Sequence, residues 1–151
     1  MKKSLKTEEI VNAYGILKDA KYQKLEDSDK VKVWKISRAM KSVATQYEED
    51  RIDASKTLVT EEVARNLHKA QEYERKRNAG LEDLPMTDGE YQEYIKEFLK
   101  CKALVESALK ESLEKETELG FEPLSEDAFG KLLASNDWSL SQADVLGFIV
   151  E

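Results

Sequence analysis

Two segments of the chain carry apolar residues mostly every three or four positions, and neither segment has an interior proline or glycine. This spacing places side chains on one face of an α-helix. We therefore predict long helices over residues 29–58 and 90–119. The first apolar stripe consists of Val33, Ile36, Met40, Val43 and Tyr47, and the second of Tyr91, Ile95, Phe98, Val105 and Leu109.

These two helices are expected to pack against each other, because a single apolar face must be buried. The pattern predicts an all-α fold in which two long antiparallel helices form a coiled-coil-like spine, with shorter N-terminal and C-terminal helices packed on it. At 151 residues the chain has the size of a single domain. We divide this domain into a helical half over residues 1–80, a connection over 81–89 and a second half over 90–151. The stretch from Gly80 to Gly89 holds two of the six glycines and one of the two prolines.

Helix-capping residues mark the shorter elements before the connection. Thr7-Glu8-Glu9 predicts the start of a first helix that ends near Tyr22. Thr60-Glu61-Glu62 repeats this start signal, so residues 59–61 either break the second helix or continue it into a third one, which ends at Gly80.

The C-terminal part contains two further capping signals. Ser125-Glu126-Asp127 predicts a helix that Asn136-Asp137 ends. The segment 141–144, Ser-Gln-Ala-Asp, predicts a capping box for a last short helix. Residues 145–150 fit a helix or a strand, since Phe148-Ile149-Val150 favours both, and no second strand is evident.

Composition indicates a soluble, ordered protein, with 40% hydrophobic and 36% charged residues. The first six residues lack the apolar stretch of a signal peptide, and no run approaches the length needed to span a membrane. We therefore expect a cytoplasmic protein without a membrane partner. Residues 1–41 have a net charge of +5, against −12 for residues 42–151, which makes the molecule an electrostatic dipole able to orient partners.

Few residues are suited to catalysis or metal binding. His68 is the only histidine, and Arg65 stands where a di-iron motif requires glutamate. Cys101 is the only cysteine, which excludes an internal disulfide and a cysteine-pair zinc site. Neither a phosphate-binding glycine loop nor a nucleophile elbow is present. We expect a protein that is not an enzyme and that has no cofactor, no metal and no small-molecule substrate.

Trp34 is the main candidate for an interaction residue, because it lies near Lys30, Arg38 and Lys41 on the second predicted helix. An aromatic ring among cations stacks on a nucleobase or on a partner's ring. The alternative is that Trp34 packs under the first helix with Arg38 across its indole. Trp138 and Phe148 complete the candidate partner surface, although the apolar C-terminus also fits a cap over the open end of the long helices.

The layout of helices is similar to that of a known group of proteins. Ile10 and Leu17 in a first helix, Val33-x-x-Ile36-Ser37-Arg38 and Tyr47-Glu48-Glu49-x-Arg51 in a second, and a terminal Phe129-x-x-Leu132-Leu133 segment carry the similarity. In these features the chain resembles small uncharacterised α-helical proteins encoded by phages and prophages. The resemblance implies a viral or mobile-element setting and a role in protein assembly or interaction.

Two functions follow as hypotheses. The first is a non-catalytic protein-binding or assembly module that has a protein partner or associates with itself. The second is a nucleic-acid-binding accessory protein that uses the basic N-terminal surface around Lys30, Trp34, Arg38 and Lys41, although eleven cations accompanied by six anions make a modest footprint for phosphate binding.

Overall fold

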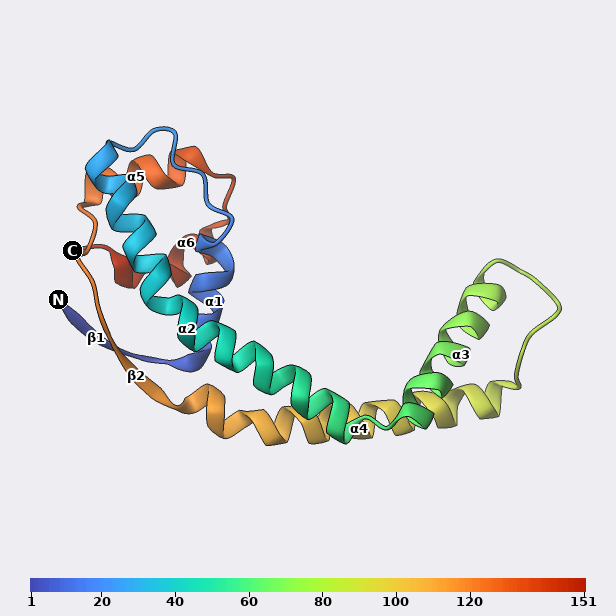
Figure 1. The fold of residues 1–151 in the computed structure, drawn as a ribbon. Coiled ribbons are helices and arrows are strands. Elements are labelled where there is room, and N and C mark those ends of the chain that lie inside the picture. Colours follow the sequence, from blue (N-terminus) through green and yellow to red (C-terminus); the bar gives the residue numbers. More distant parts are fainter. The chain divides into compact units, whose positions relative to one another are not determined.

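In the computed structural model, which describes all of residues 1–151, most of the chain is α-helical and a single small sheet is present (Figure 1). The prediction of a predominantly helical fold is thus confirmed. The elements in chain order are β1 (Lys2–Lys6), α1 (Thr7–Leu17), α2 (Asp27–Leu58), α3 (Glu61–Asn78), α4 (Asp88–Glu114), β2 (Glu116–Gly120), α5 (Glu126–Ser135), α6 (Leu140–Val145) and the 3-10 helix η1 (Gly147–Ile149).

The chain forms two compact units. Unit 1 consists of Met1–Glu48 and Ser112–Glu151, and unit 2 consists of Glu49–Glu111. Helix α2 therefore contributes its first part to unit 1 and its last turns to unit 2. The predicted connection over residues 81–89 lies within unit 2, where it joins α3 to α4.

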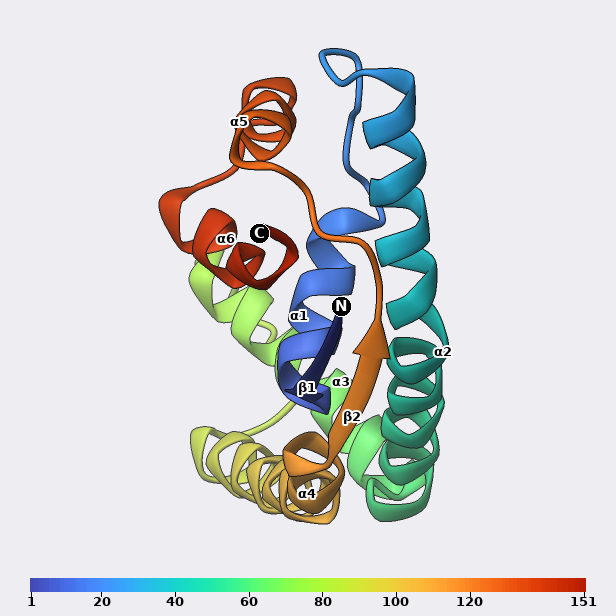
Figure 2. The ribbon, with the colours of Figure 1, turned by 90° about the vertical axis from the view of Figure 1, so that its left-hand side faces the viewer.

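Unit 1 contains one contiguous hydrophobic core to which α1, α2, α5 and the C-terminal segment all contribute. Val33, Ile36 and Met40, which the sequence analysis assigns to the spine, are buried in this core. In Figure 2, α1 lies between α2 and α6, and α5 lies above them, level with the first turns of α2. The fully buried large side chains of the protein are Ile10, Leu17, Val33, Ile36, Met40, Leu124, Leu132, Leu146 and Ile149.

The sheet of unit 1 pairs β1 and β2 antiparallel, with Lys2 opposite Gly120 and Lys6 opposite Glu116. The prediction that a helix extends through residue 119 is wrong, because α4 ends at Glu114 and the next residues form β2. The extended conformation satisfies the backbone groups by pairing with β1, and it places Leu119 in the core beside Leu5.

Most helix ends follow the predicted capping residues. Helix α2 stops at Leu58, and Thr60 caps α3 by accepting a hydrogen bond from the Val63 N–H at 3.3 Å, so residues 59–61 break the helix. Ser125 caps α5 as predicted. The last capping box begins two residues earlier than predicted, at Ser139 rather than at Ser141.

The other ends differ from the predictions. Helix α1 ends at Leu17 rather than near Tyr22, and the Thr7 hydroxyl donates to the Lys115 carbonyl at 3.1 Å instead of capping α1. In the segment 145–150, η1 is followed by Val150, which forms an isolated parallel bridge with Leu124. This segment therefore contains a 3-10 turn and one bridge residue, rather than a regular strand.

The segment that joins α1 to α2 is held on α5 by side-chain to backbone hydrogen bonds. The Asn136 carboxamide accepts from the Lys21 N–H at 2.8 Å and donates to the Lys21 carbonyl at 2.9 Å. Ser135 Oγ accepts from the Lys24 N–H at 3.3 Å. These bonds keep the intervening Tyr22 against the core, where it is partly buried.

Partial burial raises the pKa of the Tyr22 phenol. The neutral phenol is therefore favoured in the folded state, so its contribution to stability is complete below the ordinary pKa near 10 and is lost as the pH rises through the folded value. We expect the denaturation midpoint of the wild type to fall above about pH 10 more steeply than that of Tyr22→Phe. Equal slopes for the two proteins between pH 8 and 11 would show that the phenol does not contribute.

Unit 2 places α3 and α4 in contact through aromatic side chains. The rings of Tyr73 and Tyr91 have centroids 5.0 Å apart, and the guanidinium of Arg77 lies over both rings at 5.3 and 5.4 Å. Asp88 Oδ1 accepts from Arg77 Nη1 at 3.2 Å and from the Tyr73 hydroxyl at 3.4 Å. These contacts join the last turns of α3 to the first turn of α4. Gly80, just after α3, adopts a positive φ of 73°.

Helices α2 and α4 are the longest in the protein, but neither has the continuous apolar stretch that crossing a membrane requires, and the same is true of every other helix.

Candidate interaction surface

The exposed side of α2 in unit 1 carries a tryptophan in an unusual position. Trp34 is 52% exposed, although large aromatic side chains are mostly buried in proteins of this size. The guanidinium carbon of Arg38 lies 5.2 Å from the indole ring, which is the geometry of a cation–π contact. The two residues are four positions apart, so one helical turn aligns them. The alternative in which Trp34 packs under the first helix is therefore wrong, because the indole is exposed, although Arg38 does lie over its ring as that alternative described.

Lysine side chains flank this pair on the same face of α2. At 100° per residue, Lys30, Trp34, Arg38 and Lys41 fall within an arc of about 80°. Their side lies opposite Val33, Ile36 and Met40, which point into the core. We call these four residues, Lys30, Trp34, Arg38 and Lys41, the basic α2 face.

Acidic residues are absent from this part of α2. Between Lys30 and Tyr47 the chain has five lysine or arginine residues and no aspartate or glutamate. The face has an ion pair only at its N-terminal end, where Lys30 Nζ lies 3.6 Å from Asp27 Oδ1. Trp34, Arg38 and Lys41 are all exposed. The surface is therefore locally cationic, although the chain as a whole has a net charge of −7.

Trp138 and Phe148, the other two candidate partner residues, lie at the C-terminal segment and not on the basic α2 face. Both are partly buried and pack against the core of unit 1. The Phe148 ring meets the Phe121 ring edge to face at 6.0 Å, and the Phe148 carbonyl accepts a hydrogen bond from Lys3 Nζ at 2.9 Å. These contacts place the C-terminal segment on the core of unit 1.

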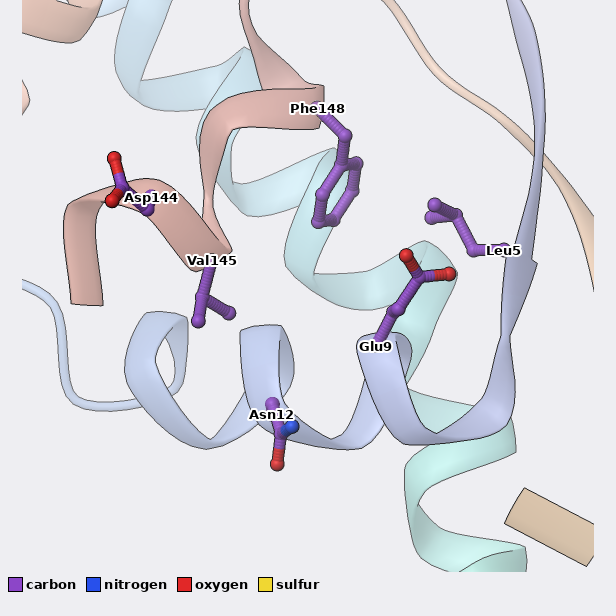
Figure 3. Close-up of a pocket in the computed structure, with 6 residues that line it drawn as sticks. All are labelled: Leu5, Glu9, Asn12, Asp144, Val145 and Phe148. Carbon is purple, nitrogen blue, oxygen red and sulfur yellow. The ribbon is translucent and has the colours of Figure 1, made fainter. Parts of the chain in front are cut away.

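A shallow hollow of about 400 Å³ lies between β1, α1 and the C-terminal segment (Figure 3). Its lining residues are Leu5, Glu9, Asn12, Asp144, Val145 and Phe148. In the close-up the Glu9 carboxylate points between Leu5 and the Phe148 ring, whereas Asp144 and Asn12 point away from that space. Glu9 Oε2 already accepts a hydrogen bond from the Lys6 N–H at 2.8 Å, so this carboxylate is part of the α1 cap.

Residues suited to chemistry are dispersed in the structure. No group of three or more histidine, cysteine, aspartate or glutamate side chains is placed to hold a metal ion. His68 is exposed on α3, and Cys101 is half-buried on α4. In unit 2 partial desolvation, followed by the charge of Glu74, raises the pKa of Tyr91, which belongs to the aromatic contact between α3 and α4.

Comparison of the chain with protein-family models, with curated proteins and with solved structures finds no match. Two surfaces stand out: the basic α2 face in unit 1 and the apolar side chains that unit 2 leaves in contact with water.

Proposed function

We propose that the protein is a non-catalytic assembly module that associates with a second copy of itself through unit 2. The observation that carries the proposal is the small number of buried side chains in this unit. Ala70, Tyr73 and Leu109 are its buried hydrophobic residues, whereas Ile52, Leu99 and Leu104 are 42%, 54% and 50% exposed.

A helical unit with so little buried area has a weak core of its own. Burial of apolar surface is the main favourable term in folding, and small units gain the least of it. Unit 1 differs sharply, because its core contains buried side chains from α1, α2, α5 and η1 and from both strands. Association would bury the leucines of α4 and add the apolar contacts that unit 2 lacks. Since identical chains commonly form closed symmetric assemblies, a second copy is the simplest partner.

Two sequence-based predictions belong with this proposal. The antiparallel, coiled-coil-like pairing of the two long helices, which are α2 and α4 in the structure, stays a prediction. The phage or prophage setting also stays a prediction, which the identity of the adjacent genes would test.

Solution mass measures the proposed association directly. We expect the purified protein to have at least the mass of a dimer at about 100 μM, by light scattering and sedimentation equilibrium. Leu104→Glu should weaken association by at least about tenfold, since burying one leucine contributes roughly 1.5–3 kcal/mol and a symmetric interface contains two.

Gln71→Glu is the charge control, because Gln71 is exposed on α3 of unit 2 rather than beside the leucines of α4, and the substitution adds the same charge without removing an apolar side chain. Its mass should equal that of the wild type. A wild-type protein that remains monomeric up to several hundred micromolar would contradict self-association through unit 2.

A further inference from the structure

We infer that the basic α2 face binds single-stranded nucleic acid, with phosphates against Lys30, Arg38 and Lys41 and a base stacked on the exposed indole of Trp34. This inference concerns unit 1 and is independent of the proposed assembly through unit 2. Its basis is the joint occurrence of an exposed tryptophan, an arginine over its ring and a run of helix without a carboxylate.

The net charge of −7 does not oppose this inference, because screening makes the local charge decisive. At physiological ionic strength the Debye length is about 8 Å, so exposed carboxylates further from the face contribute little to the potential there. Along α2 the carboxylates nearest to Trp34 are Asp29 and Asp27 before the face and Glu48 after it. Asp27 is already paired with Lys30 at 3.6 Å.

The exposed indole is the feature that favours a nucleic acid over other anions. Every base has an apolar π-face that stacks on an aromatic side chain without sequence preference, and arginine adds a cation–π contact. Arg38 lies over the Trp34 ring, which orients the ring and places a cation beside any base that stacks on its free part. An anion without rings gains only the charge contacts.

The form of the surface favours a flexible strand over a folded acidic protein. The face is the exposed side of one helix, and none of its residues lines the hollow of Figure 3. A folded partner would need a complementary pocket for the indole. A single strand adapts its backbone to a convex helix. At 1.5 Å per residue, Lys30 lies about 12 Å from Arg38 along the axis of α2, with Trp34 between them, and Lys41 lies about 4.5 Å beyond Arg38.

The number of cations sets the expected affinity and its dependence on salt. For single strands, the logarithm of the binding constant falls against the logarithm of the salt concentration with a slope of about −0.7 per neutralised phosphate. Three contacts, from Lys30, Arg38 and Lys41, give a slope near −2, or about a 20-fold loss between 50 and 200 mM salt. Binding without sequence readout typically has a Kd of roughly 10⁻⁴ to 10⁻⁶ M.

Fluorescence reports on Trp34 directly once the other tryptophan is removed. Trp138 packs against the core away from the face, so Trp138→Phe leaves Trp34 as the only tryptophan. We expect a 12-residue oligothymidylate at 50 mM salt to quench this fluorescence in a saturable way. The binding constant from such titrations should fall with salt concentration with the slope near −2 given above. Absence of saturable quenching and of any anisotropy change with labelled oligonucleotide up to 1 mM protein would overturn the inference.

Substitutions on the face separate stacking from charge. By the anisotropy of a labelled oligonucleotide, Trp34→Ala should weaken binding about tenfold or more, whereas Trp34→Phe should retain most of it. Arg38→Gln should weaken binding and reduce the salt slope by about 0.7. Lys18→Gln removes an exposed cation from unit 1 outside the face. It should leave both the oligonucleotide affinity and the salt slope nearly unchanged, because only one distant charge is lost. Circular dichroism verifies that each variant is folded.

Two further outcomes decide between ligands and between surfaces. Polyglutamate of similar length should displace the labelled oligonucleotide only weakly. If polyglutamate competes as well as oligothymidylate and Trp34→Ala does not change the affinity, the face is a site for acidic proteins, which would overturn the inference. Leu104→Glu, which tests association through unit 2, should leave oligonucleotide binding unchanged. Failure of one proposal is thereby distinguished from failure of the other.

Discussion

Removal of residues 137–151 is expected to abolish the cooperative unfolding transition of unit 1. This segment contributes Leu146 and Ile149, which are both fully buried. It also holds the chain by backbone hydrogen bonds from the Leu124 N–H to the Ile149 carbonyl at 2.7 Å and from the Glu151 N–H to the Leu124 carbonyl at 2.9 Å. Loss of two buried large side chains costs several kcal/mol, which is most of the stability of a typical domain.

Thermal or denaturant unfolding followed by circular dichroism measures this effect. A single-site version, Ile149→Ala, should cost about 2–5 kcal/mol. Leu140→Ala is its control, because Leu140 belongs to the same segment but is 81% exposed, and it should change the stability by no more than about 0.5 kcal/mol. If the truncated protein unfolds as cooperatively as the whole chain, the C-terminus is not part of the core.

The second large effect concerns the strand that replaces the end of the predicted helix. Leu119→Ala is expected to lower the free energy of unfolding by about 2–4 kcal/mol, because the side chain is only 6% exposed and belongs to the core of unit 1. Its neighbour Glu118 points to the opposite face of the strand and forms an exposed ion pair with Lys2 at 3.9 Å. Glu118→Ala should therefore cost no more than about 0.5 kcal/mol.

The contrast between these neighbours distinguishes a strand from a helix. Urea denaturation of each variant gives its free energy of unfolding. If the slope of this free energy against urea concentration equals that of the wild type, the variant keeps the two-state transition. Similar costs for Leu119→Ala and Glu118→Ala would be inconsistent with the alternation that β2 imposes.

The helices were predictable because their signals are local. Periodicity of three to four residues and capping residues such as Thr60 and Ser125 lie within the helices that they specify. The partner of an apolar stripe is not a local property. The stripe of α2 correctly predicted that Val33, Ile36 and Met40 are buried, but these residues lie in a core made with α1, α5 and the C-terminal segment.

The strands were not predictable from their own residues. β1 reads Lys-Lys-Ser-Leu-Lys and β2 reads Glu-Thr-Glu-Leu-Gly, so each has a single buried apolar side chain among polar ones. Each strand is stabilised by the other, and Glu116 stands 110 residues after its partner Lys6. A five-residue segment with one apolar residue does not show the alternation of apolar and polar residues that identifies a strand, so its sequence does not distinguish it from the polar end of a helix.

The candidate surface was located by sequence only in part. The spacing places Lys30, Trp34 and Arg38 on one side of α2, and in the structure the guanidinium of Arg38 lies 5.2 Å from the centroid of the indole ring. Sequence did not decide whether the ring is covered, because burial depends on which elements pack over that side of α2. The hydrophobicity of Trp138 and Phe148 suggests a place on the partner surface, whereas the structure places both side chains against the core.

The pairing of β1 with β2 has a consequence for the newly made chain. At 5–20 residues per second, ribosomes need roughly 6 to 20 s to synthesise the residues between Lys6 and Glu116. Throughout this interval the apolar side chains of the first 48 residues lack the C-terminal residues that complete their core. Such a high contact order slows folding and exposes the nascent N-terminal region to aggregation, so chaperones that hold emerging chains should raise the yield of native protein.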